Sequence, residues 1–259
     1  MARFLRHIRC ENCGSSDANA IYDDGGSFCF SCHDKSRPTM SPLVAKAQRN
    51  REDVSDVKPL PDDLSTHFGS DAVAWLGKYH VPIETLIARG VRYSPSKNQL
   101  VFTFPWTGDK QFFQARNLSE SDWRGRKLSK YFTSGPHEGL LPIYQMAVQP
   151  LEGPRQLVLT EDCLSAITLA DSGALEGRRI DAMPLLGTNL PTSKLTRLAK
   201  LYRSLVVWLD HDKAKEAMKI AQRAKMLGMQ ARVVITEQDP KELTDEEISG
   251  LFFVSSQRA

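Results

Sequence analysis

Between Cys10 and Cys32 the chain reads CENCGSSDANAIYDDGGSFCFSC, with two Cys-x2-Cys turns separated by fifteen residues. Each turn points two sulfurs toward one ion, and two such turns complete a tetrahedral thiolate site of the kind that binds structural zinc. Two disulfides are the alternative, but they are typical of small secreted domains and not of a 259-residue chain that opens MARFLRHIRC. The spacing predicts a zinc ribbon held by Cys10, Cys13, Cys29 and Cys32.

The composition is that of a soluble globular protein. Hydrophobic residues make up 41% and charged residues 25% of the chain, which is long enough for a small module and one or two cored domains. No apolar run approaches the ~20 residues of a membrane span. Cys163 is the only cysteine outside the ribbon. These features favour a reduced, cytoplasmic setting without a membrane partner.

Positive charge is concentrated in two segments. Residues 1–51 hold eight Lys or Arg against five acids, and residues 89–131 hold nine against three. Such segregation suits a polyanionic partner, although a solvated protein surface gives the same pattern.

The middle of the chain divides into a linker and a mixed region. Residues 34–61 contain four prolines and no aromatic residue, which predicts a flexible linker at 36–61 with a helical turn near 43–48. Beyond it we expect helices near 71–79 and 83–88. The sequences QLVFTFPW and KQFFQARNL predict a hairpin joined by a turn at 107–109, followed by a polar basic loop at 119–136.

From Gln156 onward the hydrophobic pattern alternates between strands and helices. We expect strands at 156–160, 181–186, 205–209 and 230–235, and helices at 162–173, 192–204 and 213–228. This alternation predicts an α/β fold with a mainly parallel sheet and flanking helices, in which ligands bind beyond the carboxyl ends of the strands.

Acidic residues follow two of these strands. Glu161 comes directly after one, and Asp210 and Asp212 come directly after another. Two aspartates at i and i+2 can point to the same side, and a neighbouring glutamate completes an oxygen-rich site of the kind that Mg²⁺ prefers. Helix capping is the alternative explanation for each acid taken singly. For three acids at one sheet edge, we favour a magnesium site.

Taken together, these motifs resemble DnaG-type primases, and most of all the primase half of the primase–helicases of short-tailed phages. The resemblance rests on the ribbon, on Thr160-Glu161, on Leu209-Asp210-His211-Asp212 and on Asp239-Pro240 with Glu242. It also includes Arg116 and the stretch from Lys130 to Ser134. It implies a zinc-ribbon DNA-binding domain at 1–35, an α+β RNA-polymerase subdomain at 62–150, a Toprim catalytic subdomain at 151–238 and a C-terminal helical tail at 239–259.

The resemblance also implies the roles of single residues. The catalytic residues would be Glu161, Asp210 and Asp212, and magnesium would be held by Glu161, Asp210, Asp212 and Asp239. The nucleotide or DNA would be bound by Arg116, Lys127, Lys130, Tyr131 and Lys241.

Several positions depart from the family pattern. Asp162 replaces the glycine, and Ser165 the second acid, of the first Toprim motif, and Lys241 stands where bacterial members often have a carboxylate. The acids that remain are enough for one magnesium site. A second requires that Asp162 turn inward to supply the missing charge. The ribbon histidine with which phage members read the template is Gly26 in this chain.

The expected function is that of a DNA primase, which makes short RNA primers from ribonucleoside triphosphates on single-stranded DNA, with one structural Zn²⁺ and one or two catalytic Mg²⁺. The alternative is a catalytically weak DNA-binding adaptor that recruits a helicase. The sequence contains no Gly-x4-Gly-Lys-Ser/Thr motif, so a separate replicative helicase is the expected partner unless the chain is a fragment. If a phage encodes the protein, it would act in the host cytoplasm.

Overall fold

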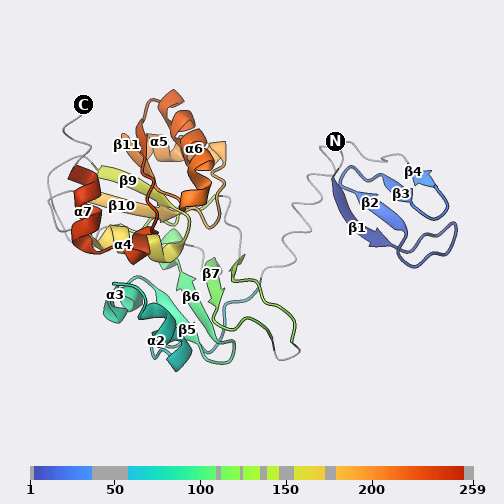
Figure 1. The fold of residues 1–259 in the computed structure, drawn as a ribbon, viewed down its shortest axis with the longest axis horizontal. Coiled ribbons are helices and arrows are strands. Elements are labelled where there is room, and N and C mark those ends of the chain that lie inside the picture. Colours follow the sequence, from blue (N-terminus) through green and yellow to red (C-terminus); the bar gives the residue numbers. More distant parts are fainter. Residues whose placement is uncertain are drawn as a thin grey trace. The chain divides into compact units, whose positions relative to one another are not determined.

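The computed structural model describes residues 3–36, 58–108, 112–122, 125–134, 139–145, 155–172 and 179–253. It divides into two compact units, Met1–Val57 and Lys58–Ala259 (Figure 1). The helical turn near 43–48 and most of the predicted linker at 36–61 lie outside the described residues, whereas residues 58–61 belong to the second unit. The domain boundaries inferred from the sequence stay predictions.

The first unit is a small antiparallel sheet with strand order β1-β2-β3-β4. The strands span Phe4–Ile8, Asn19–Tyr22, Ser27–Cys29 and Lys35–Ser36. Its described part buries three apolar side chains, those of Cys10, Ala20 and Cys29. A core of this size is far too small to order the chain by the hydrophobic effect alone.

The second unit begins with two short helices and an antiparallel sheet. The helices are α2 (Ser70–Leu76) and α3 (Ile83–Ala88), close to their predicted positions. The sheet has the order β5-β6-β7-β8, with strands Val91–Ser94, Gln99–Thr103, Phe113–Asn117 and Tyr131–Ser134. The predicted hairpin is confirmed as β6 and β7, which pair Thr103 with Phe113.

One prediction in this region is wrong. Strand β8 (Tyr131–Ser134) falls inside the stretch 119–136 that the sequence predicted to be a loop. The strand residues YFTS favour β structure, but the polar and basic residues before them hide this signal. The strand forms because β7 provides an edge with which it pairs, from Phe113↔Ser134 to Arg116↔Tyr131.

The second half of this unit contains the predicted parallel sheet, with the order β10-β9-β11-β12. Its strands span Arg155–Thr160 (β9), Arg179–Pro184 (β10), Ser204–Val207 (β11) and Gln230–Val233 (β12). All neighbouring strands are parallel. The chain adds β10 on one side of β9 and β11 on the other, so the strand order reverses beside β9. Such a switch point is where open α/β sheets bind ligands.

Helices cover both faces of the parallel sheet (Figure 1). Alternate strand residues point to opposite faces. Leu157 and Leu159 therefore pack with residues of α5 (Thr192–Leu201) and α6 (Ala214–Met226). Val158 instead joins a core that includes α4 (Cys163–Ser172) and α7 (Asp245–Phe253). That core also contains Phe102 of the antiparallel sheet, so the two halves of the second unit share one hydrophobic core.

Gly90 joins α3 to β5 in a conformation that other residues rarely adopt. Its φ is +83°, and a Cβ atom there would lie 2.9 Å from both the carbonyl oxygen and Oγ1 of Thr103. We expect Gly90→Ala to lower the free energy of unfolding of the second unit by about 1–3 kcal/mol. Denaturant unfolding followed by tryptophan fluorescence measures this, because all four tryptophans belong to this unit.

Gly108 provides the matched control for this substitution. Its φ is +81°, but nothing lies within 4 Å of a Cβ atom placed there. Gly108→Ala should therefore cost only the conformational part, about 1 kcal/mol. Equal losses in the two variants would show that the contact with Thr103 has no energetic weight.

Candidate zinc and acidic sites

The four ribbon cysteines lie together in the first unit. Their sulfurs are all within 4.8 Å of one another. The Sγ–Sγ distances are 3.7 Å for Cys10–Cys32 and 3.7 Å for Cys13–Cys29. These distances are far longer than the ~2.05 Å of a disulfide. They match the edge of about 3.75 Å of a tetrahedron with Zn–S bonds of 2.3 Å. The thiols therefore fit a structural zinc ion, as the sequence predicted.

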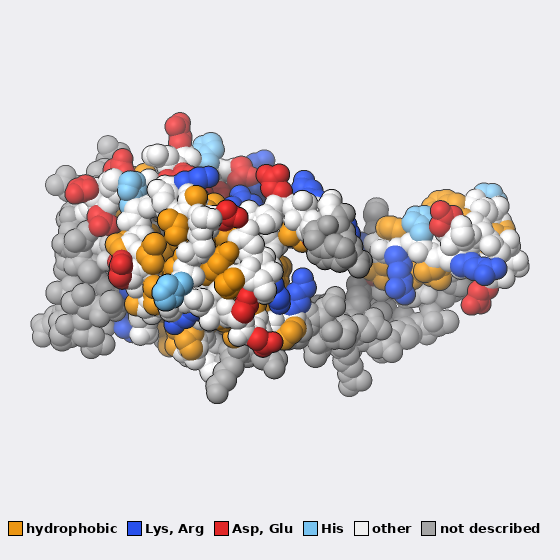
Figure 2. All heavy atoms as spheres, turned by 90° about the horizontal axis from the view of Figure 1, so that it is seen from below, with side chains coloured by type: hydrophobic (Ala, Val, Ile, Leu, Met, Phe, Trp, Pro, Cys, Tyr) orange, Lys and Arg blue, Asp and Glu red, His pale blue; other side chains and the backbone are white. Residues whose placement is uncertain are grey.

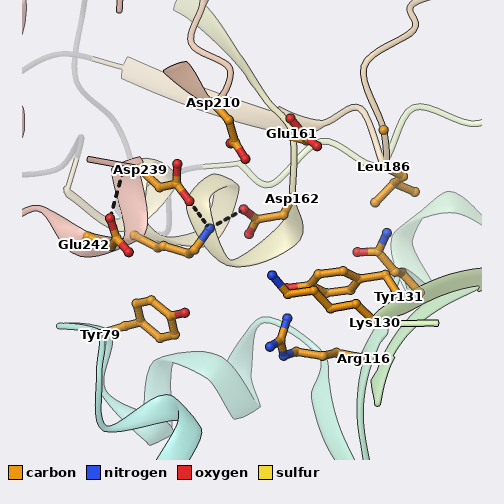
Figure 3. Close-up of a pocket in the computed structure, with 13 residues that line it drawn as sticks. Tyr79, Arg116, Lys130, Tyr131, Glu161, Asp162, Leu186, Asp210, Asp239 and Glu242 are labelled. Carbon is orange, nitrogen blue, oxygen red and sulfur yellow. Dashed lines mark hydrogen bonds and ion pairs between the residues drawn. The ribbon is translucent and has the colours of Figure 1, made fainter. Parts of the chain in front are cut away.

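A pocket of about 400 Å³ lies in the second unit beyond the carboxyl ends of the parallel strands (Figure 3). One wall is acidic and comes from the parallel-sheet half, whereas the other is basic and aromatic and comes from the antiparallel half. The lining residues are Tyr79, Gln114, Arg116, Lys130, Tyr131, Glu161, Asp162, Leu186, Gly187, Asp210, Asp239, Lys241 and Glu242.

Three carboxylates converge in the acidic wall. Oxygens of Asp162, Asp210 and Asp239 all lie within 4.8 Å of one another. They follow strands β9, β11 and β12, which the parallel sheet brings to one edge. Asp162 also caps α4, because its Oδ1 accepts from the backbone N–H of Ser165 at 3.0 Å. These three acids thus lie together at the switch point, with Asp162 turned inward.

The surroundings of Glu161 and Asp210 disfavour the ionised forms of both carboxyl groups. Burial, followed by repulsion from Asp210, raises the pKa of Glu161. The pKa of Asp210 is raised by burial and then by Asp239. Among the described residues, Oε2 of Glu161 is buried and has no hydrogen-bond partner. A bound cation would relieve both effects. This donor set of carboxylate oxygens fits Mg²⁺.

Lys241 lies inside the same wall. Its Nζ donates to Oδ2 of Asp162 at 2.8 Å and to Oδ2 of Asp239 at 2.6 Å. Its side chain is only 11% exposed. Burial disfavours the ammonium, but the two ion pairs outweigh this effect and raise the pKa of Lys241. The resemblance implies that Lys241 binds the nucleotide or DNA. In the structure its ammonium group instead forms ion pairs with two carboxylates of the protein.

Asp212 lies outside the residues that line the pocket. It belongs to the 3-10 helix η4 (His211–Lys213), its side chain is 69% exposed, and it pairs with Lys213. Asp210 and Asp212 would point to the same side only if the backbone there were extended like a strand. Strand β11 ends at Val207, before both aspartates. Of the predicted catalytic residues, the structure thus brings Glu161 and Asp210 into the pocket.

The basic wall is built around Arg116 of β7. Its guanidinium lies 4.2 Å from the ring centre of Trp75 and 4.9 Å from that of Tyr131. Two aromatic faces hold a guanidinium by cation–π attraction and leave its edge available for hydrogen bonds. Burial and the nearby Asp162 raise the pKa of Tyr131 to about 12, so its hydroxyl stays neutral. Lys130 is exposed and lines the pocket, whereas Lys127 is exposed and does not.

Several basic residues of the 89–131 segment already have protein partners. Arg89 pairs with Asp171 at 3.4 Å. Arg92 donates to two backbone carbonyls, and Arg126 pairs with Asp122 at 2.7 Å. The charge excess of this segment therefore overstates the number of side chains that can contact a polyanion.

Sequence reasoning missed three contributors to the pocket: Tyr79, Gln114 and the Leu186–Gly187 turn. Leu186 has a φ of +58°, and its backbone N–H donates to the carbonyl of Glu161 at 3.1 Å. The Gly187 that follows this strand was the one available signal of a turn there.

The fold and the sites define a class: a protein with a four-cysteine ribbon and a mixed α/β unit whose parallel sheet, flanked by helices, carries an acidic pocket. This confirms the predicted fold class. Within the parts of the chain that the structure describes, no helix has both the length and the apolar character needed to cross a membrane.

The chain matches a DNA helicase/primase of Enterobacteria phage T3, with 30% identity over 176 residues. The match includes 65% of this chain and 28% of the phage protein, so the chain spans less than a third of that relative. No protein-family model matches. The chain is thus similar in sequence to part of a phage helicase/primase, the kind of protein that its motifs resemble.

Solved structures of primases also align with the chain. The primase fragment of the bacteriophage T7 primase-helicase aligns over 99% of this chain and 100% of its own, with 18% identity and a TM-score of 0.44. The zinc-binding and RNA polymerase domains of the Aquifex aeolicus primase align over 96% of this chain and 79% of theirs, with 15% identity and a TM-score of 0.47.

Proposed function

We propose that this chain is a DNA primase, which makes short RNA primers on single-stranded DNA. The observation that carries the proposal is the pocket, in which clustered carboxylates face Arg116 and Lys130 within one unit. Carboxylates that can hold a divalent cation, opposite groups that can bind phosphate, are the elements that nucleotidyl transfer requires. The sequence relationship to a helicase/primase supports the same function.

In the proposed reaction the 3′-hydroxyl of one nucleotide attacks the α-phosphate of a ribonucleoside triphosphate. A new P–O bond forms, and the bond to the β-phosphate breaks, which releases pyrophosphate. The proton of the attacking hydroxyl passes to water, because Glu161 is proposed to hold the cation. Arg116 binds phosphate oxygens through its free edge, and Lys130 adds a point charge. Mg²⁺ held by Asp210 and Glu161 would supply charge stabilisation to the phosphates.

The ribbon is proposed to contact the template. All residues of β1 are exposed, including Phe4 at 46%, and Phe30 is 57% exposed. Figure 2 shows basic and hydrophobic side chains together on this unit. Exposed aromatic rings can stack with bases at about 1–3 kcal/mol per base, and the neighbouring basic residues can contact phosphates. A separate replicative helicase is the proposed partner, and the cytoplasm is the proposed location.

Incorporation of labelled ribonucleotides on a pool of random single-stranded DNA tests this function. The zinc-loaded chain should yield short, alkali-sensitive products that require both template and Mg²⁺. Sequencing the productive templates would then give the start site. If the protein binds the DNA but incorporates no ribonucleotide, even with a helicase supplied, the non-catalytic adaptor becomes the better explanation.

A further inference from the structure

An ammonium group already occupies one side of the acidic cluster. The Nζ atom of Lys241 forms ion pairs with Asp239 and Asp162 at 2.6 and 2.8 Å, which are drawn as dashed lines from these two carboxylates in Figure 3. These are the distances of charge-assisted hydrogen bonds. Because the side chain is 11% exposed and emerges from the 3-10 helix η5 (Pro240–Glu242), it has little freedom to leave.

The two carboxylates that bind Lys241 are also held by the backbone. Asp162 accepts from the N–H and the hydroxyl of Ser165, at 3.0 and 3.1 Å. Asp239 begins η5 in a capping box with Glu242. Each therefore has a fixed orientation, and the Lys241 ammonium offsets part of the negative charge on this side of the pocket.

The other side of the cluster differs. Neither Glu161 nor Asp210 forms an ion pair with a Lys or Arg in the parts of the chain that the structure describes. Oε2 of Glu161 is buried without a hydrogen-bond partner. In Figure 3 both carboxylates lie on the far side of Asp162 from the basic wall. Among the described residues, Glu161 and Asp210 are thus carboxylates of the acidic wall that have no direct ammonium partner.

We propose that Lys241 is a resident cation that takes the place of one divalent cation, so that the pocket binds a single divalent cation, at Glu161 and Asp210. This deepens the proposed function, on which it rests. An ammonium between two carboxylates excludes a second metal ion by charge and by volume. It also explains the combination of an inward-turned Asp162 with a lysine at position 241, because each residue satisfies the other.

Counting bound Mn²⁺ tests this proposal, with the free ion measured by electron paramagnetic resonance and the full chain kept zinc-loaded. The wild type should bind one Mn²⁺ per chain. Lys241→Met, which removes the charge but keeps the length, should bind one ion more than the wild type. Lys241→Arg should bind the same number as the wild type, because it keeps the charge. Lys219→Met, at an exposed position of α6, is the control for loss of a lysine and should also bind one.

Thermal unfolding gives a second readout. Without added divalent ions, Lys241→Met leaves Asp162 and Asp239 unpaired and should lower the Tm by about 5 °C or more. Mn²⁺ should restore the Tm of this variant by more than it raises that of the wild type. The restoration also shows that the variant is folded. Lys219→Met should show neither effect.

Equal Mn²⁺ counts in the wild type and Lys241→Met, or any wild-type count other than one, would overturn the proposal. These counts do not depend on activity. Primer synthesis by a wild type that binds two ions would reject the resident cation and leave the proposed function intact. One ion in the wild type and two in Lys241→Met, without primer synthesis, would support the resident cation and reject the function.

Discussion

Asp210→Asn should reduce primer synthesis by about 10³-fold or more while leaving the second unit folded. Asp210 is the carboxylate in the pocket that lies beside both Glu161 and the Asp162–Asp239 pair and that has no ammonium partner among the described residues. Loss of a cation ligand removes several kcal/mol of stabilisation from the developing charge, and each 1.4 kcal/mol corresponds to a tenfold change in rate. Incorporation of labelled ribonucleotides measures this effect.

The stability of this variant should change in the opposite direction. The pKa of Asp210 is raised, so its ionised form is disfavoured in the folded state and lowers stability at neutral pH. Replacement by the neutral amide removes this repulsion, so the Tm without divalent ions should stay the same or rise. Glu237→Gln is the control, because Glu237 is an exposed acid near the same sheet edge but outside the pocket. A lower Tm in Asp210→Asn would attribute the loss of activity to misfolding.

The parallel sheet could be predicted because its signals are local. Its central strands β9 and β11 contain short apolar runs, and helices α5 and α6 repeat an apolar face. The sequence extended β11 to Leu209, whereas the strand ends at Val207, because Trp208 and Leu209 are buried and apolar but lie outside the strand. Strand β8 was not predicted, because the polar and basic residues before it hide the β preference of YFTS and the edge of β7 with which it pairs has no local signal.

The sequence predicts that acidic residues gather at this edge of the sheet, but it does not predict which of them point into the pocket. The carboxyl ends of parallel strands meet at one edge, which is why Glu161 and Asp210 were found from the hydrophobic pattern, whereas Asp239 was found only through the family resemblance. Which acid points into the pocket depends on the backbone just beyond each strand. The 3-10 turn at His211–Lys213 directs Asp212 to the surface, and the helix cap at Asp162 directs that residue inward. Neither turn has a signal in the hydrophobic pattern.

Loss of zinc should unfold the first unit and spare the second. The described part of the first unit buries only Cys10, Ala20 and Cys29 among its apolar residues, so the metal replaces a hydrophobic core. Structural zinc contributes about 10–16 kcal/mol of binding free energy in small zinc domains, and such domains are unfolded without it. Cys29→Ser should therefore reduce the zinc content from one ion per chain to near zero and make residues 3–36 sensitive to protease.

The second unit has its own cores and contains all four tryptophans, so its fluorescence-detected unfolding should not change in Cys29→Ser. Template-dependent primer synthesis should be lost, because the unit proposed to hold the template no longer folds. Cys163→Ser is the matched control, since Cys163 is buried in α4 and donates to Gln114 at 3.3 Å. It should keep the zinc and instead lower the stability of the second unit by about 1 kcal/mol. Retention of zinc by Cys29→Ser, or its loss from Cys163→Ser, would contradict the assignment of the four ribbon cysteines as the zinc ligands.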